Sequence, residues 1–165
     1  MLTQLAETPS RITALTAALS PEVLQTRPTP DEWSANEVLA HLRACADVWG
    51  NYILRIIDED RPTLRAVNPR TWIKQTDYHQ SVYLSSLHFF TTQRADLLAK
   101  LEPLSSDAWE RAATVKGGGR MHEETVLSYA ERLVVHERPH IKQIAGIVNT
   151  LMGREDGEST QEGIL

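Results

Sequence analysis

The sequence predicts an all-α protein, a four-helix bundle formed by one domain over residues 1–152. Apolar side chains recur every three or four residues along four long segments, which is the spacing of a helix buried on one side. The strict alternation of apolar and polar residues that marks strands is nearly missing. Because one short and two longer connections join the four segments, the pattern is typical of a helical bundle.

The composition agrees with a single domain and excludes several classes of protein. The chain has 165 residues, 41% of them hydrophobic, and its 17 Lys and Arg against 22 Asp and Glu give a net charge of −5. A single cysteine excludes a framework of internal disulfides, and the acidic balance lacks the positive field that nucleic acids and anionic membranes attract. Neither a secretory signal nor an apolar run of membrane-spanning length is found. We therefore expect a cytoplasmic protein with no nucleic-acid and no membrane partner.

The first helix is predicted over residues 9–19, with Thr8 as its N-cap and Pro9 at the first helical position, where proline is favoured. Continuing this helix backwards through residues 2–7 would place Pro9 inside it and kink it. Ser20-Pro21-Glu22 then opens a short helical turn.

The second helix has the clearest start in the sequence. Ser34 and Glu37 form a capping box, in which each side chain satisfies a backbone N–H at the helix start. One continuous apolar stripe runs from there to about Glu59, and it includes a histidine, His41. Its members are Val38, His41, Leu42, Cys45, Val48, Trp49, Tyr52, Ile53 and Ile56.

A long connection over residues 60–76 separates the second and third helices. It contains Pro62 and Pro69, and connections of this length inside a compact domain are uncommon and often functional. The third helix is predicted over residues 77–101. Its apolar contacts come from Val82, Leu87, Phe90, Leu97, Leu98 and Leu101.

The fourth helix lies near the end of the chain. Residues 105–109 form a short helical turn before it, and three glycines at 117–119 mark a flexible loop. The helix itself is predicted from about Glu123 to Leu151. The polar residues 153–165 that follow are predicted to form a disordered tail.

Three of the six histidines point to a metal site. His136 and His140 lie four residues apart, so they project from one face of the fourth helix, and that face is the apolar stripe of the helix. Two imidazoles at this spacing chelate one cation, with Zn–N bonds of about 2.0–2.1 Å. Because His41 lies on the apolar stripe of another helix, the three residues predict a three-histidine site with an open coordination position.

Other interpretations of the titratable residues stay open. An inward histidine is more often a hydrogen-bonded core residue than a ligand, although three such imidazoles would need three separate partners. Cys45, one turn after His41, is a soft fourth ligand, a nucleophile or a small buried hydrophobe, and the last is favoured. His79, His88 and His122 are expected to be solvated at the surface.

Residues 136–140 match the H-E-x-x-H signature of zinc metalloproteases, in which Glu137 would be the general base acting on a zinc-bound water. Pro139 counts against a peptidase, because a proline inside the motif removes a backbone hydrogen bond and bends the helix. A third zinc ligand is also missing where such a peptidase would carry it. Glu137 stays the candidate catalytic residue of a different kind of metal site.

Two segments resemble motifs of the DinB-like superfamily. Residues 32–42, EWSANEVLAHL, are similar to its WS-x-x-E-x-x-x-H-L segment, and residues 136–144, HERPHIKQI, are similar to its H-x-x-x-H-x-x-Q-I segment. The resemblance covers residues 3–151. It implies an up-down-down-up four-helix bundle, often a homodimer, in which His41, His136 and His140 hold a divalent metal.

The resemblance also implies a chemistry. Zinc and nickel both occur in such proteins, and the general order of metal affinities does not choose between them. Some relatives are S-transferases or isomerases that use low-molecular-weight thiols such as bacillithiol or mycothiol, and others are described only as metal-dependent hydrolases. We therefore expect an enzyme that activates water or a thiol against a small-molecule substrate. The alternative is a non-enzymatic bundle that binds a ligand, with a structural or incidental metal.

Several further residues are candidates for supporting roles around this site. Asp47 and Gln143 would accept hydrogen bonds from the ligating histidines. The connection over residues 60–76, with Trp72, would cover the pocket. Its arginines would hold the carboxylates of a thiol cofactor, and these arginines are Arg61, Arg65 and Arg70.

Overall fold

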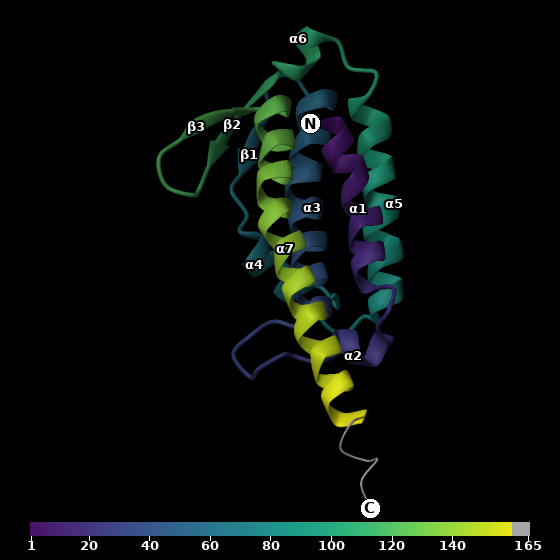
Figure 1. The fold of residues 1–165 in the computed structure, drawn as a ribbon. Helices are drawn as coiled ribbons and strands as arrows, with labels where there is room; N and C mark the ends of the chain where they lie inside the picture. The colour runs from purple at the N-terminus through teal and green to yellow at the C-terminus, as the bar shows by residue number, and fades with distance from the viewer. Residues whose placement is uncertain (160–165) are drawn as a thin grey trace, which may run out of the picture.

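The computed structural model describes residues 1–159, with side chains as far as residue 153. Its body consists of four long helices: α1 (Leu2–Thr16), α3 (Ala35–Asp58), α5 (Tyr83–Leu101) and α7 (Val126–Ser159). α3 packs against α5 and α7, and α1 packs against the same two helices. α1 and α7 run one way along the bundle and α3 and α5 run the other way (Figure 1). The predicted up-down-down-up bundle is therefore confirmed.

The capping box predicted at the start of α3 is present. The Oγ of Ser34 accepts a hydrogen bond from the N–H of Glu37 at 3.1 Å, and the Glu37 carboxylate accepts one from the N–H of Ser34 at 2.8 Å. The predicted short helices are present too, each with a serine as its N-cap. They are α2 (Pro21–Gln25) and α6 (Ser106–Trp109).

The first helix begins earlier than predicted. α1 starts at Leu2 and carries Pro9 inside it, so Thr8 is not an N-cap; its hydroxyl instead donates to the carbonyl of Gln4 at 3.1 Å. Burial explains the longer helix, because Leu5, one turn before Pro9, is fully buried and anchors the first turns. The packing of that turn outweighs the backbone hydrogen bond that a proline removes.

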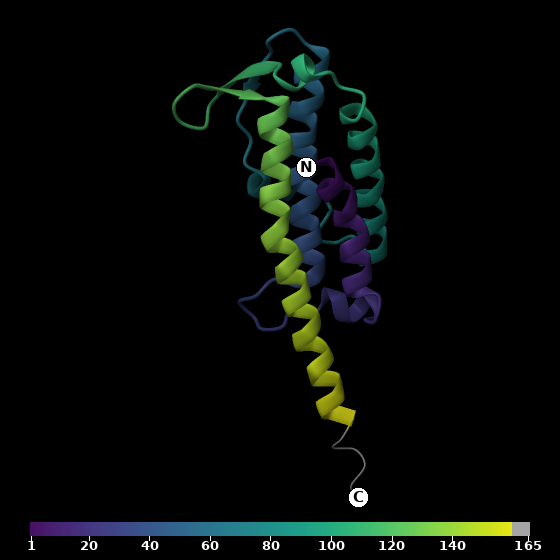
Figure 2. The ribbon, with the colours of Figure 1, turned by 45° about the horizontal axis from the view of Figure 1, so that its top comes forward.

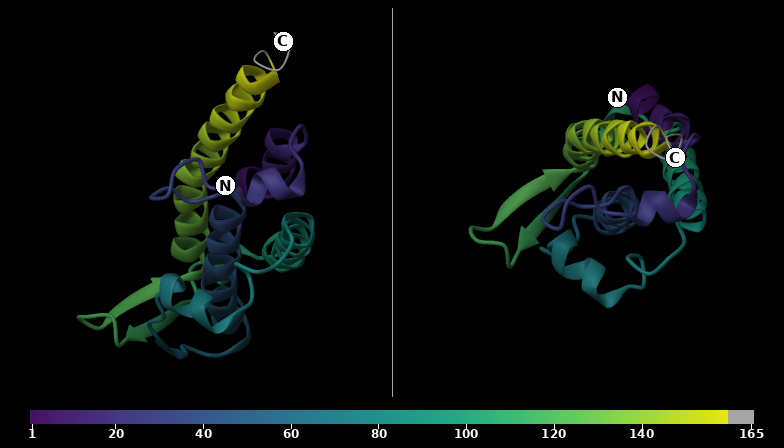
Figure 3. Two further views of the ribbon diagram at one scale, coloured as in Figure 1. Left: turned by 90° about the horizontal axis from the view of Figure 1, so that it is seen from below. Right: turned by 60° about the horizontal axis from the view of Figure 1, so that its bottom comes forward.

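Because α3 and α5 are parallel, the chain has to return along the bundle between them. The returning segment contains β1 (Thr63–Arg65), α4 (Pro69–Trp72) and the 3-10 turn η1 (Ile73–Gln75). α4 and η1 both contact α3, and Figure 3 shows them on the outside of the four-helix arrangement. The long connection predicted over residues 60–76 thus covers one side of α3.

The third helix begins at Tyr83 and not at residue 77 as predicted. Residues 77–81 form turns, in which the N–H groups of Gln80 and Ser81 donate to the carbonyl of Asp77 at 2.9 and 3.1 Å. The Asn36 side chain of α3 donates to the Ser81 carbonyl at 3.2 Å, which holds this segment away from a helical path. Val82, expected to be an apolar contact, is 52% exposed.

A small sheet that the sequence analysis did not predict closes one end of the bundle. Its order is β1-β2-β3, with β1 parallel to β2 and β2 antiparallel to β3, and the added strands are β2 (Ala112–Lys116) and β3 (His122–Thr125). The β2–β3 hairpin projects sideways from the start of α7 (Figure 2). Residues 123–125, predicted as the first turn of the fourth helix, belong to β3. Strands this short bury too few alternating side chains to show a period of two.

The C-terminal helix is longer than predicted. α7 continues past Leu151 to Ser159, so the first residues of the predicted tail are helical, and residues 160–165 lie outside the described residues. The division into a 1–152 domain and a tail over 153–165 stays a prediction. Within residues 1–159, no helix carries an apolar stretch of the length that a bilayer requires.

Candidate metal centre

A polar layer crosses the middle of the bundle, between two large apolar clusters. One cluster surrounds the α2 end and the other the sheet end. Between them, α1 contributes Thr8, α5 contributes Arg94 and α7 contributes Glu137, all three buried. His41 of α3 and His136 of α7 lie on the side of this layer where those two helices face each other. The polar layer therefore interrupts the core at the level of the predicted site.

The three histidines singled out in the sequence come together at this point. The ring centroids of His41 and His136 are 5.1 Å apart, those of His41 and His140 are 5.0 Å apart, and those of His136 and His140 are 4.7 Å apart. The Nε2 atoms of His41 and His136 are 3.3 Å apart. Two nitrogen ligands at 2.0–2.1 Å in a tetrahedral zinc site lie about 3.3 Å from each other. These two imidazoles thus stand at the separation that one such cation requires.

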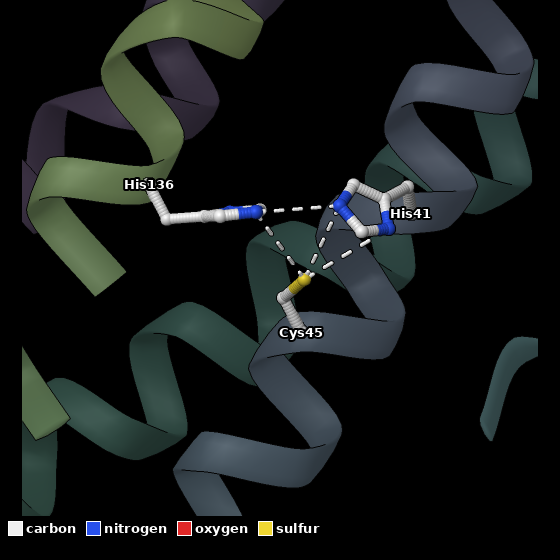
Figure 4. Close-up of side chains that lie close together, drawn as sticks. All are labelled: His41, Cys45 and His136. Atoms are coloured by element: carbon white, nitrogen blue, oxygen red, sulfur yellow. Dashed lines mark hydrogen bonds between the residues drawn. The ribbon is translucent and has the colours of Figure 1, made fainter. Parts of the chain in front are cut away.

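Cys45 is buried, as predicted, and it also belongs to the same cluster, so its thiol is a candidate ligand. It lies one turn after His41 on α3, and Figure 4 shows its thiol pointing at the gap between the two imidazoles. The Sγ atom is 3.6 Å from the His41 Nε2 and 4.0 Å from the His136 Nε2. A sulfur at about 2.3 Å and a nitrogen at about 2.0–2.1 Å from one zinc ion are about 3.6 Å apart. The ligand atoms of His41, Cys45 and His136 lie within 4.8 Å of one another and form a candidate metal site.

His140 lies beside this His–His–Cys cluster and is not part of it. Its Nδ1 is 2.9 Å from the Oε1 of Gln143, the residue predicted to support a ligating histidine. Its ring stacks on the indole of Trp33, with an interplanar angle of 11° and centroids 6.5 Å apart. The predicted three-histidine ligand set and the observed cluster therefore share His41 and His136 and differ in the third residue.

Burial keeps the imidazoles of the site neutral. Loss of solvation is the main reason that the pKa of His41 and that of His136 each fall from 6.5 to about 4, and the neighbouring histidines add to it. Burial lowers the pKa of His140 too, against the opposing effect of Gln143. A neutral imidazole offers a nitrogen lone pair to a metal, whereas an imidazolium does not.

Two further observations test whether the residues fit a metal. Burial raises the pKa of Cys45 to about 12 in the metal-free protein, so its thiol stays protonated without a cation to stabilise the thiolate. The Nδ1 of His136 is buried and has no hydrogen-bond partner among the described residues. Among these residues, the polar contacts of the His136 ring are made through its Nε2, which faces His41 and Cys45. A set of two nitrogens and a sulfur suits a borderline-soft divalent ion such as zinc.

Glu137, the candidate catalytic residue, points into the core and away from the three rings. Its carboxylate pairs with the guanidinium of Arg94 on α5, and both side chains are almost fully buried. The reason is the helical period, since consecutive side chains differ by about 100° around the axis. Burial raises the pKa of Glu137, and Arg94 opposes this effect. The structure therefore places Glu137 against Arg94 and not, as predicted, at the metal site.

Asp47 has a different role from the one predicted. Its carboxylate accepts hydrogen bonds from the Nε1 of Trp72 at 3.2 Å and from the hydroxyl of Tyr78 at 2.7 Å, and Gln93 donates to its other oxygen. These bonds tie the connection between α3 and α5 to α3. Asp47 thus positions the returning segment and does not support a histidine.

The remaining histidines are exposed, as expected, although His79 lies near enough to His41 to contribute to the lowering of its pKa. His79 is exposed in the turns before α5, and His88 is exposed on α5 itself. His122 is exposed in β3, beside the glycine loop.

A cavity of about 560 Å³ opens next to His140. Trp33 from the loop before α3, Arg70 from α4 and Gln143 from α7 line it together with His140. Because His140 borders both the cavity and the other two imidazoles, a small molecule in this cavity would lie directly beside the cluster. The site is thus a largely buried group of candidate metal ligands with one side accessible to solvent.

The fold and the site together define a class, a four-helix bundle with a candidate metal centre between its second and last long helices. The chain belongs to the DinB superfamily, whose model matches residues 4–144. Among solved structures it is similar to YfiT from Bacillus subtilis, described as a probable metal-dependent hydrolase with an unusual four-helix bundle topology. That match has a TM-score of 0.76 at 18% identity and covers 92% of this chain and 85% of YfiT. Among curated proteins, none matches this chain.

Proposed function

We propose that this protein is a metal-dependent enzyme that acts on a small molecule at the centre between α3 and α7, with water or a low-molecular-weight thiol as the nucleophile. The observation that carries the proposal is the convergence of three imidazoles, one buried and two half-buried, beside an open cavity. Burial lowers the pKa of all three rings, which favours the neutral form whose nitrogen lone pair binds a cation. The likeness to YfiT supports the proposal, because that protein is described as a probable metal-dependent hydrolase.

His41, His136 and His140 are the ligands in this proposal. The Gln143 oxygen beside the Nδ1 of His140 favours the tautomer with the proton on Nδ1, which leaves the Nε2 lone pair free for a cation. The His140 ring already stands as close to the other two rings as they stand to each other. Cys45 then lies against the site as a protonated thiol, and it is the competing candidate for the third ligand.

The chain's own residues determine access and orientation. When bound, a zinc or nickel ion supplies Lewis acidity and brings the pKa of a coordinated water or thiol towards neutrality. The edge of Trp49 packs against His136, with centroids 4.9 Å apart, and Trp33 packs against His41 and His140. These two indoles hold the imidazole planes and shield them from water where they pack. The substrate enters from the cavity, which opens beside His140.

Metal content tests the ligands directly. We expect His41→Ala and His136→Ala each to abolish stoichiometric zinc or nickel in protein purified without a histidine tag. Each variant leaves only two of the three ligands, and solvent in place of the third lowers the affinity for the metal strongly. His140→Ala should lower the metal content in the same way, because His140 is the third ligand in this proposal. The matched control is His88→Ala, which removes an exposed histidine and should leave the metal content unchanged.

Cys45→Ala distinguishes the two candidates for the third ligand. We expect it to retain the metal. Loss of metal in Cys45→Ala together with retention in His140→Ala would instead assign the third position to the thiol. A cobalt-loaded protein adds a spectroscopic measurement, since a thiolate ligand produces a charge-transfer band that an all-histidine site lacks.

Activity tests separate the two nucleophiles. Metal-loaded protein is incubated with the electrophile monochlorobimane and a panel of low-molecular-weight thiols, and in parallel with ester and amide substrates without thiol. A rate that depends on both metal and thiol supports transfer, and a metal-dependent rate without thiol supports hydrolysis. If the protein holds stoichiometric metal but shows neither rate, or if it holds no metal at any stage, the alternative of a non-enzymatic ligand-binding bundle is supported instead.

A further inference from the structure

The cavity beside the histidines has one positive side chain close to the site. Arg70, on α4, lines the cavity with Trp33 and His140, and its guanidinium carbon is 5.8 Å from the centroid of the Trp33 ring. Its charge lies close enough to His41, His136 and His140 to lower the pKa of all three. Among the described side chains, no carboxylate forms an ion pair with it. Arg70 is therefore a cation that faces the site without a bound anion.

The cavity also has two negative side chains. Asp31 and Glu32 also line it, and the Glu32 carboxylate accepts a hydrogen bond from the hydroxyl of Thr29 at 2.9 Å. The pKa of His140 is shifted by burial, by Gln143 and by Arg70, and neither of these two carboxylates contributes. Of the charged side chains that line the cavity, Arg70 is the one whose charge acts on the pKa of His140.

We infer that Arg70 binds an anionic group of the substrate, such as a carboxylate, and that the adjoining apolar or aromatic part of the substrate lies against the indole of Trp33. This inference rests on the proposed function for the reaction, and it names the class of molecule on which the site acts. A guanidinium binds a carboxylate through two parallel N–H···O bonds, which fixes orientation as well as charge. An indole face next to it accepts a flat or apolar group without a polar partner.

The same arrangement selects against other small molecules. A substrate with a positive group near the reacting atom would meet Arg70 at short range and be repelled. The carboxylates of Asp31 and Glu32, which also line the cavity, would disfavour a second negative group on the ligand. The expected ligand is therefore a small monoanion or zwitterion with its negative group towards the histidines.

Titration with two aromatic probes of similar size and opposite charge tests this inference. Phenylacetate and phenethylamine are added to the full chain, once loaded with zinc and once metal-free, and dissociation constants are measured from NMR shifts of the tryptophan indole N–H signals. We expect phenylacetate to bind about tenfold tighter than phenethylamine. Arg70→Ala should weaken phenylacetate binding about tenfold, and Arg70→Lys should restore part of it, because lysine keeps the charge and loses the bidentate geometry.

The control variant is Arg65→Ala, which removes the same charge from the same connection at a position that does not line the cavity. It should leave both dissociation constants unchanged. The inference is wrong if Arg70→Ala binds phenylacetate within about twofold of the unmodified chain in both metal states, or if the unmodified chain binds both probes equally well. The metal-free titration does not depend on any cation. It therefore tests the role of Arg70 even if the protein proves to bind no metal and the proposed function fails.

Discussion

His41 and His136 show how burial at single residues sets the chemistry of the site. Both rings are taken out of water by the packing of α3 against α7, and the neighbouring imidazoles add mutual repulsion to the charged forms. The same burial that makes an imidazolium unfavourable provides the neutral nitrogen that a cation binds. The folded, metal-free chain therefore already presents neutral imidazole nitrogens at the candidate site.

This burial predicts how the stability of the metal-free protein depends on pH. The pKa of each of the two rings falls from 6.5 to about 4 on folding, so between these values the unfolded chain binds more protons than the folded one. Stability that is complete above pH 6.5 is therefore lost as the pH falls towards 4. We expect the Tm of metal-free protein to drop steadily from pH 7 to pH 4.5 in calorimetry.

The control is the double variant His41→Asn, His136→Asn, which keeps the carboxylates that also titrate at low pH. Its Tm should fall less steeply over the same range than that of the unmodified chain. Equal slopes for the two proteins would show that these histidines are not held neutral by the fold.

At the scale of helices, the polar layer shows how the H-E-x-x-H pattern of this chain departs from that of a zinc peptidase, in which the glutamate faces the metal. His136 and His140 share one face of α7, whereas Glu137 turns to the face that packs against α1 and pairs across the core with Arg94 of α5. A buried carboxylate whose charge is compensated in this way holds three helices in register. We expect its role to be structural.

Breaking this pair should therefore cost stability. We expect Glu137→Ala to lower the free energy of unfolding by about 3–5 kcal/mol in urea titrations, because it leaves the Arg94 cation buried without its counterion. Glu131→Ala, an exposed glutamate on the same helix, is the matched control and should change it by less than about 0.5 kcal/mol.

A second variant separates the structural role from a catalytic one. Replacing both partners, Arg94→Met with Glu137→Leu, should recover most of the lost stability and keep the metal content. If Glu137→Ala instead keeps full stability while metal-dependent activity disappears, the carboxylate acts in the reaction after all.

The helices were predictable from the sequence wherever a local signal marks them. The capping box at Ser34, the serine caps of α2 and α6 and the continuous stripe of α3 all have their counterparts in the structure. Errors occurred where contacts distant in sequence decide the outcome. The turns before Tyr83 depend on Asn36, and β1 exists because β2, nearly fifty residues later, pairs with it.

At the scale of the whole molecule, we propose that the protein is a homodimer. Val82 and Phe89, seven residues apart and thus on one side of the α5 end, are 52% and 57% exposed, and a group of large exposed apolar side chains is typical of an interaction surface. Light scattering should give twice the chain mass of 18.6 kDa. Phe89→Glu should give monomers, whereas Val135→Glu, at an exposed position on α7, should not. A mass of 18.6 kDa for the unmodified chain would exclude the dimer.

The sequence by itself determined the helical bundle and the inward orientation of His41, His136 and His140, because both follow from local periodicity. A residue on the apolar stripe of an amphipathic helix must point inward wherever that helix packs. The tertiary structure alone decided the rest of the site: that Cys45 lies between His41 and His136, that Glu137 faces Arg94, and that Arg70 borders the cavity. These relations join residues from different helices and from the returning segment, and a one-dimensional pattern contains no information on how far each helix is rotated against its neighbours.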